Sequence, residues 1–190
     1  MNKNFIVIFF VLIFLSLFSC KRQSPILTDE DKAMLLRVED FKSVGLLSNI
    51  GTDFSPNYEK SRKVLKSWFL KYSLSYVKEG EIPIIISEKI TFEDSVNTAK
   101  KTYIGTDKSF IATLIGRHST MVEVQTLLDW GDETKFYIIF SDGNKVGNVI
   151  LVRIDKKVFQ IYFSGFYFNS PLDFEYLIKP KLELLKNYKY

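Results

Sequence analysis

Cysteine and histidine are almost absent from this sequence, which contains Cys20 and His118 and no others. A single cysteine excludes an internal disulfide, so the fold must be held by packing alone. A single histidine excludes a histidine-rich metal site, and a catalytic triad would have to combine His118 with a distant serine and carboxylate. A G-x-S-x-G elbow, a Walker loop and an H-E-x-x-H motif are also missing. We therefore expect no enzyme and no cofactor.

An excess of charge of one sign is missing as well. The chain has 26 basic and 22 acidic residues, a formal net charge of +4, with both signs interspersed. Nucleic-acid binding calls for a basic stripe with stacking aromatic residues, whereas the densest basic runs, at 60–66 and 100–101, are typical of solvated faces. We expect no nucleic-acid partner. Since there is no internal repeat or second composition regime, one domain is expected.

One long apolar run stands at the N-terminus. Lys3 precedes an uninterrupted apolar stretch at 5–15, the arrangement of a secretory signal peptide. The run ends at Ser16 and is short for the roughly 20 apolar residues that a spanning helix needs. Leu17-Phe18-Ser19-Cys20 follows and resembles the lipobox of bacterial lipoproteins, with Phe18 departing from the smaller residue usual at that position.

This resemblance implies that residues 1–19 are a cleaved signal peptide and that Cys20 carries diacylglycerol and an amide-linked acyl chain such as palmitate. Residues 20–28 are then a tether, and several acyl chains hold the protein at a membrane. Lipoproteins that stay at the inner membrane commonly have an aspartate directly after the lipidated cysteine, whereas this chain has Lys21 there. The resemblance therefore favours the outer membrane of a two-membrane cell envelope. A type I signal peptide or an uncleaved anchor, with Cys20 incidental, stays open as an alternative.

Residues 29–190 are expected to form a single α+β domain, an antiparallel sheet with helices packed on one face and a C-terminal helix. Thr28 predicts the N-cap of a first helix that extends to Val38, followed by an irregular segment to residue 57. Alternating apolar residues predict a β-hairpin over 66–92, with its turn at Glu79-Gly80.

A helix capped by Thr91 and ended by Gly105 should follow the hairpin. Further strands are expected at 109–116, 120–128, 135–141, 147–155 and 158–167, with Asp142-Gly143-Asn144 as a turn. The segment 147–155 is apolar on both faces, which is typical of a central or helix-covered strand. Ser170 and Pro171 begin the C-terminal helix, and Pro180 predicts a kink or a break near residue 176, with helix on either side.

Three segments carry a second resemblance: the lead-in Leu36–Phe41, the turn Gly131-Asp132-Glu133 before a strand, and the closing strand Phe159–Gly165 before a terminal helix. Their order is similar to that in the PsbP-like fold and in the extracellular sensor domain of PknH-type kinases, over residues 34–188. The resemblance implies a ligand-binding or accessory role in the envelope and transfers no catalytic residue.

Two groups of residues are candidate sites. Asp129, Asp132 and Glu133 surround Gly131 and are weak candidates for a calcium site, with a solvated turn as the alternative. Aromatic residues are abundant near the last strand, and exposed ones would form a binding surface, with the hydrophobic core as the alternative. The aromatic candidates are Trp130, Phe163, Phe166, Tyr167 and Phe168.

Together these features predict a membrane-anchored envelope lipoprotein whose domain binds a protein, a glycan or a small apolar ligand without a reaction. The alternative from another class is a structural or accessory factor in envelope assembly, which would present an open strand edge or a flat aromatic patch. A hydrolase would require a deep pocket that holds His118 beside a carboxylate.

Overall fold

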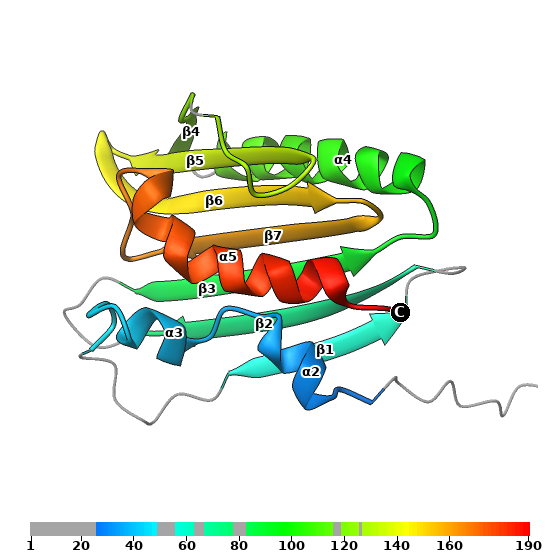
Figure 1. The fold of residues 1–190 in the computed structure, drawn as a ribbon. Helices are drawn as coiled ribbons and strands as arrows, with labels where there is room; N and C mark the ends of the chain where they lie inside the picture. Colours follow the sequence, from blue (N-terminus) through cyan, green and yellow to red (C-terminus); the bar gives the residue numbers. More distant parts are fainter. Residues whose placement is uncertain (1–25, 49–55, 63–66, 78–82, 116–118, 126) are drawn as a thin grey trace, which may run out of the picture.

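A seven-stranded antiparallel sheet forms the centre of the computed structural model, which describes residues 26–48, 56–62, 67–77, 83–115, 119–125 and 127–190 (Figure 1). The strands are β1 (Asn57–Arg62), β2 (Trp68–Tyr76), β3 (Ile84–Phe92), β4 (Ser119–Glu123), β5 (Glu133–Ser141), β6 (Asn144–Ile154) and β7 (Lys157–Ser164). The helices are α2 (Asp29–Ala33), α3 (Val38–Lys42), α4 (Val96–Ile115) and α5 (Pro171–Asn187). The predicted α+β class with an antiparallel sheet and a C-terminal helix is confirmed.

The strand order in the sheet is β1-β2-β3-β7-β6-β5-β4, so that β7 returns to the middle and joins two antiparallel ribbons. The predicted hairpin over 66–92 is confirmed as β2 paired with β3, with Tyr72 opposite Glu88; Glu79-Gly80 lies outside the described residues. The prediction for 147–155 is also confirmed, because residues 147–153 of β6 are buried. Two-sided burial of β6 requires cover on both faces of the sheet.

Helices supply that cover from both sides (Figure 1). On one face α2, α3 and α5 enclose the larger core, in which Phe41, Phe163 and Phe174 are fully buried. On the opposite face α4 packs Tyr103 and Leu114 against β5, β6 and β7. The sequence analysis predicted that all helices pack on one face of the sheet. α4 instead covers the second face, because β5, β6 and β7 carry apolar side chains on both of their faces.

Helix α4 continues through the position where an end was expected. Gly105 is exposed, and a Cβ added there would meet no atom within 4 Å. A glycine costs a helix only about 1 kcal/mol, and packing of the flanking turns offsets this cost. Residues 109–115 are therefore helical, and the predicted strand at 109–116 is wrong. Ser95 caps the helix by accepting the Thr98 N–H at 3.2 Å, and Thr91 stays in β3.

Both terminal helices differ in part from the sequence prediction. Thr28 forms the predicted cap, with Asp31 completing a capping box, but α2 ends at Ala33 and a separate helix, α3, replaces part of the expected irregular segment. Ser170 caps α5 as predicted. α5 is helical on both sides of Pro180, as expected, and it is not interrupted there. Pro180 lies on the exposed side of α5, where the Tyr176 carbonyl left without an amide partner can reach solvent.

The remaining differences concern strand ends. β4 stops at Glu123 rather than near residue 128, and Leu127 beyond it is fully exposed. β7 stops at Ser164, since Gly165 adopts a φ of +91°. β1 occupies part of the basic run at 60–66, which the sequence had assigned to a solvated face, and β1 is indeed a half-exposed edge strand.

Candidate functional site

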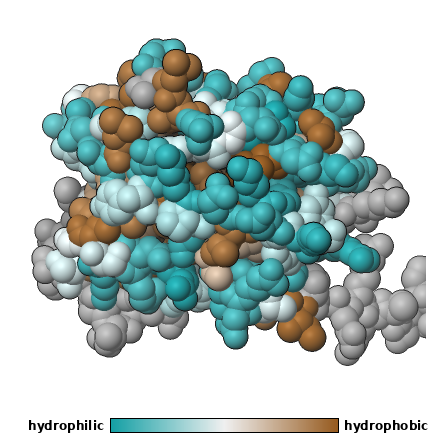
Figure 2. All heavy atoms as spheres, viewed as in Figure 1, coloured by the Kyte–Doolittle hydropathy of each residue, from teal (hydrophilic) through white to brown (hydrophobic). Residues whose placement is uncertain are grey.

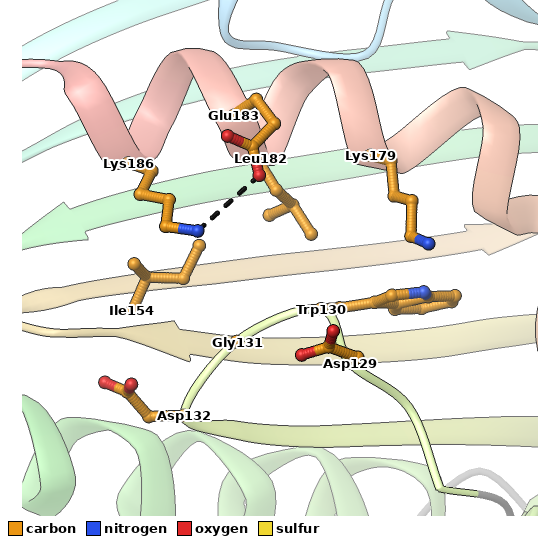
Figure 3. A pocket seen from close by; sticks show the side chains of 9 residues that line it. All are labelled: Asp129, Trp130, Gly131, Asp132, Ile154, Lys179, Leu182, Glu183 and Lys186. Atoms are coloured by element: carbon orange, nitrogen blue, oxygen red, sulfur yellow. Dashed lines mark ion pairs between the residues drawn. The ribbon is translucent and has the colours of Figure 1, made fainter.

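A hollow of about 390 Å³ lies between α5 and the loop that leads into β5 (Figure 3). Its size is within the range of small-molecule sites. We call it the Trp130 hollow. Its lining residues are Asp129, Trp130, Gly131, Asp132, Ile154, Lys179, Leu182, Glu183 and Lys186. It therefore brings part of the acidic group singled out in the sequence together with a helix some 50 residues further along the chain.

The loop side of the hollow is held tightly against β6. The Asp132 amide donates to the Arg153 carbonyl at 2.8 Å. A Cβ at Gly131 would lie 2.5 Å from that same carbonyl oxygen, so only glycine fits. Trp130, which is 4% exposed, packs edge-on against Phe136 at a centroid distance of 6.3 Å. The indole thus gives the hollow a fixed floor.

Charges of both signs line the hollow, and on α5 itself Glu183 lies 3.7 Å from Lys186. Lys179 and Lys186 extend from α5 toward it, while Asp129 and Asp132 come from the loop on the other side (Figure 3). Lys179 also forms an ion pair with Glu175 at 2.6 Å. The hydrogen bond from Lys179 lowers the pKa of Glu175, and the Glu175 carboxylate raises the pKa of Lys179. The Glu175–Lys179 pair is therefore charged near neutral pH.

Arg153 takes up two of the three carboxylates proposed as metal ligands. Its Nη1 donates to Asp132 at 2.8 Å and its Nε to Glu133 at 2.7 Å, and the guanidinium is 6% exposed. These are charge-assisted hydrogen bonds to a nearly buried cation. Asp129 lies on the exposed side of the loop. Within the described part of the chain, no three His, Cys, Asp or Glu residues are grouped to hold a metal ion.

The aromatic residues proposed as a binding surface are divided by the structure. Trp130, Phe163 and Phe168 are 4%, 0% and 7% exposed, so they belong to the core, which was the alternative interpretation. Phe166 is half-buried and stacks on Phe163 at 4.7 Å. Tyr167 is 42% exposed. Phe163 and Phe168 are therefore core residues, Trp130 is a core residue that also lines the Trp130 hollow, and Tyr167 is the well-exposed ring among the five.

The sequence analysis missed a polar cluster inside the main core. Glu88 is fully buried on β3, and its Oε2 accepts the Leu36 N–H at 2.8 Å. Burial raises the pKa of Glu88 well above its usual range, although the Leu36 N–H opposes the shift. Buried atoms of Glu88, Tyr72 and Arg37 have no hydrogen-bond partner among the described residues. The available signal was Glu88 itself, which occupies an inward position in an otherwise apolar alternation.

Cys20 and His118 lie outside the described residues. A search of protein-family models, curated proteins and solved structures finds no match for this chain. The resemblances to the lipobox, to the PsbP-like fold and to PknH-type sensor domains stay predictions. Among the helices in the described ranges, none is long and apolar enough to cross a membrane.

The lining of the Trp130 hollow is mostly charged. It offers two ammonium groups, three carboxylates and an indole, and it contains no serine, threonine, cysteine or histidine. On the face shown in Figure 2, apolar side chains form scattered groups among hydrophilic ones. What the arrangement can do is hold a charged ligand between α5 and the loop.

Proposed function

We propose that this protein is an exported lipoprotein, anchored through lipid on Cys20, whose α+β domain binds a charged ligand in the Trp130 hollow without converting it. The observation that carries the binding function is a hollow of about 390 Å³ lined by charged groups of both signs, Lys179, Glu183 and Lys186 from α5 and Asp129 and Asp132 from the loop. A small zwitterion matches this lining, because both of its charges find groups of the opposite sign there. The apolar ligand expected from the sequence suits these walls less well.

The anchor is tested by the intact mass and membrane fractionation of the protein made in a bacterial host, for wild type and Cys20→Ala. We expect a chain that begins at residue 20 with a lipid-sized mass increment, and loss of both in the variant. An unmodified mature chain in the soluble fraction would contradict the lipoprotein proposal. The localisation at the outer membrane is read from the same fractionation.

The binding function is tested by thermal melts of the lipidated protein with a panel of amino acids, dipeptides and small anions. We expect one or more to raise the melting temperature of wild type, since a ligand that binds only the folded state stabilises it. Lys179→Glu with Lys186→Glu should abolish the shift, while the same charge change at exposed Lys100 and Lys108 on α4 should not. Recovery of the ligand unchanged after incubation separates binding from hydrolysis.

A second candidate function, the accessory role in envelope assembly, is favoured by β4. This strand ends the sheet, and its sequence Ser-Thr-Met-Val-Glu has no lysine or proline of the kind that protects edge strands. Val122 is 53% exposed there. A partner could add a strand beside β4. Met121→Pro should abolish crosslinking to such a partner and leave ligand-induced shifts in melting temperature intact.

A further inference from the structure

A second hollow, of about 850 Å³, lies at the end of the sheet where β1 and β3 finish and β2 and β7 begin. We call it the Tyr190 hollow. Its lining residues are Arg62, Trp68, Glu93, Asp94, Asp155, Lys156, Lys157, Tyr188, Lys189 and Tyr190. We propose that this hollow faces the membrane and receives a zwitterionic phospholipid headgroup, one phosphate with one ammonium group. This inference rests on the lipid anchor of the proposed function.

The attachment point of the tether lies beside this hollow. The Asp31 carboxylate, in the first turn of α2, accepts a hydrogen bond from the Tyr188 hydroxyl at 2.7 Å and another from Lys60 Nζ at 2.6 Å. Asp31 is fully buried. Two separate elements, β1 and the segment after α5, therefore fix the start of α2 at the rim of the Tyr190 hollow.

Chain length brings that rim close to the bilayer. Six residue steps separate Cys20 from Ile26, and an extended chain covers at most about 3.5 Å per step, or roughly 20 Å in all. The end of the domain beside α2 is thus held near the headgroups. Asn144 starts β6, which is 11 residues long and ends at Ile154. This strand length places Asn144 roughly 33 Å from the hollow end.

The chemistry of the hollow matches a headgroup that carries both charges. Arg62, Lys156 and Lys189 are exposed and suit a phosphate, while exposed Asp94 and Asp155 suit an ammonium group. The other two charged lining side chains have internal roles. Lys157 Nζ donates to the Leu185 carbonyl at 2.6 Å, and the Glu93 carboxylate accepts from the Thr102 hydroxyl at 2.6 Å.

Aromatic rings suited to a membrane interface also line the Tyr190 hollow. Trp68 stacks on Phe92 at a centroid distance of 4.5 Å, and Tyr190 meets Phe92 edge-on at 4.8 Å. Tyr190 is 47% exposed. Tryptophan and tyrosine favour the boundary between headgroups and acyl chains, since each has an apolar ring and a polar tip.

The test uses the full lipidated protein in vesicles doped with lipids that carry a nitroxide on the headgroup. Lipid occupies the Cys20 thiol, so an introduced cysteine is a unique site for a fluorophore. Asn187→Cys, next to Tyr188, is compared with Asn144→Cys; both asparagines are exposed and each makes one local hydrogen bond to the main chain. We expect the label at 187 to lose a larger fraction of its fluorescence.

Equal quenching at both positions, or stronger quenching at 144, would overturn the proposed orientation. Adding Lys156→Glu and Lys189→Glu to the Asn187→Cys protein should reduce the quenching, whereas Lys100→Glu and Lys108→Glu, with the same change in charge, should not. No difference between these two pairs would overturn the headgroup contact.

Changing the lipid in the vesicles tests whether the ammonium group of the headgroup is recognised in addition to the phosphate. Quenching at 187 should be stronger in vesicles of lipids with phosphate and ammonium than in vesicles of lipids with phosphate and glycerol, and equal quenching would overturn recognition of the ammonium group. Intact mass, measured first, distinguishes the two proposals. Protein without lipid refutes the anchor, whereas lipidated protein with equal quenching of the labels at 187 and 144 refutes the orientation alone.

Discussion

Glu88 holds the main-chain N–H of Leu36 at 2.8 Å, across 52 positions of sequence, and both residues are fully buried. β3, which carries Glu88, lies between β2 and β7 near the middle of the sheet. The segment that carries Leu36 is therefore part of the main core. A buried carboxyl that caps a main-chain amide is costly when ionised, and this cost gives the first prediction.

The stability of the protein should fall as pH rises above the ordinary glutamate pKa of about 4.3. Burial raises the folded-state pKa of Glu88, so between the unfolded and folded values the unfolded chain loses a proton that the folded chain retains, and unfolding is favoured. Glu88→Gln keeps an oxygen for Leu36 and should remove this fall. Denaturant titrations from pH 4 to 8 measure it, with exposed Glu183→Gln as the control. Parallel curves for wild type and Glu88→Gln would refute the prediction.

Asp31 should show the opposite dependence on pH. Burial alone would raise its pKa, but hydrogen bonds from Lys60, Thr28 and Tyr188 together lower it. Its contribution to stability is therefore present above the unfolded value of about 3.9 and is lost as pH falls through the folded value. Asp31→Asn should cost about 3 kcal/mol at pH 7, the scale for breaking a buried ion pair.

The cost of Asp31→Asn should shrink at acid pH, where the wild-type carboxyl is also protonated. Free energies of unfolding at pH 7 and below pH 3 measure the change. Asp29→Asn, at an exposed aspartate two positions before Asp31, is the control. A cost that is the same at both pH values would show that the carboxylate charge is not what holds the segment.

Lys157 should matter more for α5 than a lysine usually does. Its ammonium group donates to the carbonyls of Leu185, Lys186 and Tyr188 at 2.6, 3.1 and 2.8 Å, at the negative end of the helix. Lys157→Met leaves buried carbonyls without donors and should cost about 2–3 kcal/mol. Hydrogen exchange should show the last turn of α5 opening first. Lys156→Met, at the exposed neighbour, should cost little; similar costs for both would contradict this role.

Two glycine substitutions should have opposite effects. Gly131→Ala places a methyl group 2.5 Å from the Arg153 carbonyl oxygen, so we expect it to cost about 1–3 kcal/mol and to weaken ligand binding in the Trp130 hollow. Gly105→Ala meets nothing within 4 Å inside α4 and should stabilise the protein by about 1 kcal/mol. Thermal melts of both variants check the signs, and a stabilising Gly131→Ala would mean that the loop can shift.

The features that sequence predicted well depend on neighbouring residues. The cap at Ser170 and the two-faced apolar character of β6 can each be read within about ten positions. The helix end predicted at Gly105 was wrong, because packing of the flanking turns outweighed the low helix propensity of glycine. At Pro180, which is exposed, α5 continues without interruption. Local propensity sets a preference that tertiary contacts override.

The candidate site was less accessible to sequence reasoning than the fold. The acidic group near Trp130 was noticed, but Arg153 binds two of its carboxylates, and that pairing depends on the register of β5 with β6. Lys179 and Lys186 join the hollow only because α5 crosses this end of the sheet. Contacts between segments this far apart depend on the topology of the fold, so no local sequence pattern predicts them.

The hydrogen bond between Asp31 and Tyr188 links positions 157 residues apart. Contacts of such separation form late, since a large loop must close before they are gained. During synthesis, the hydrogen bond that holds α2 through Asp31 cannot form until the segment near residue 188 has been made. The domain therefore reaches its final packing only after its last residues are available.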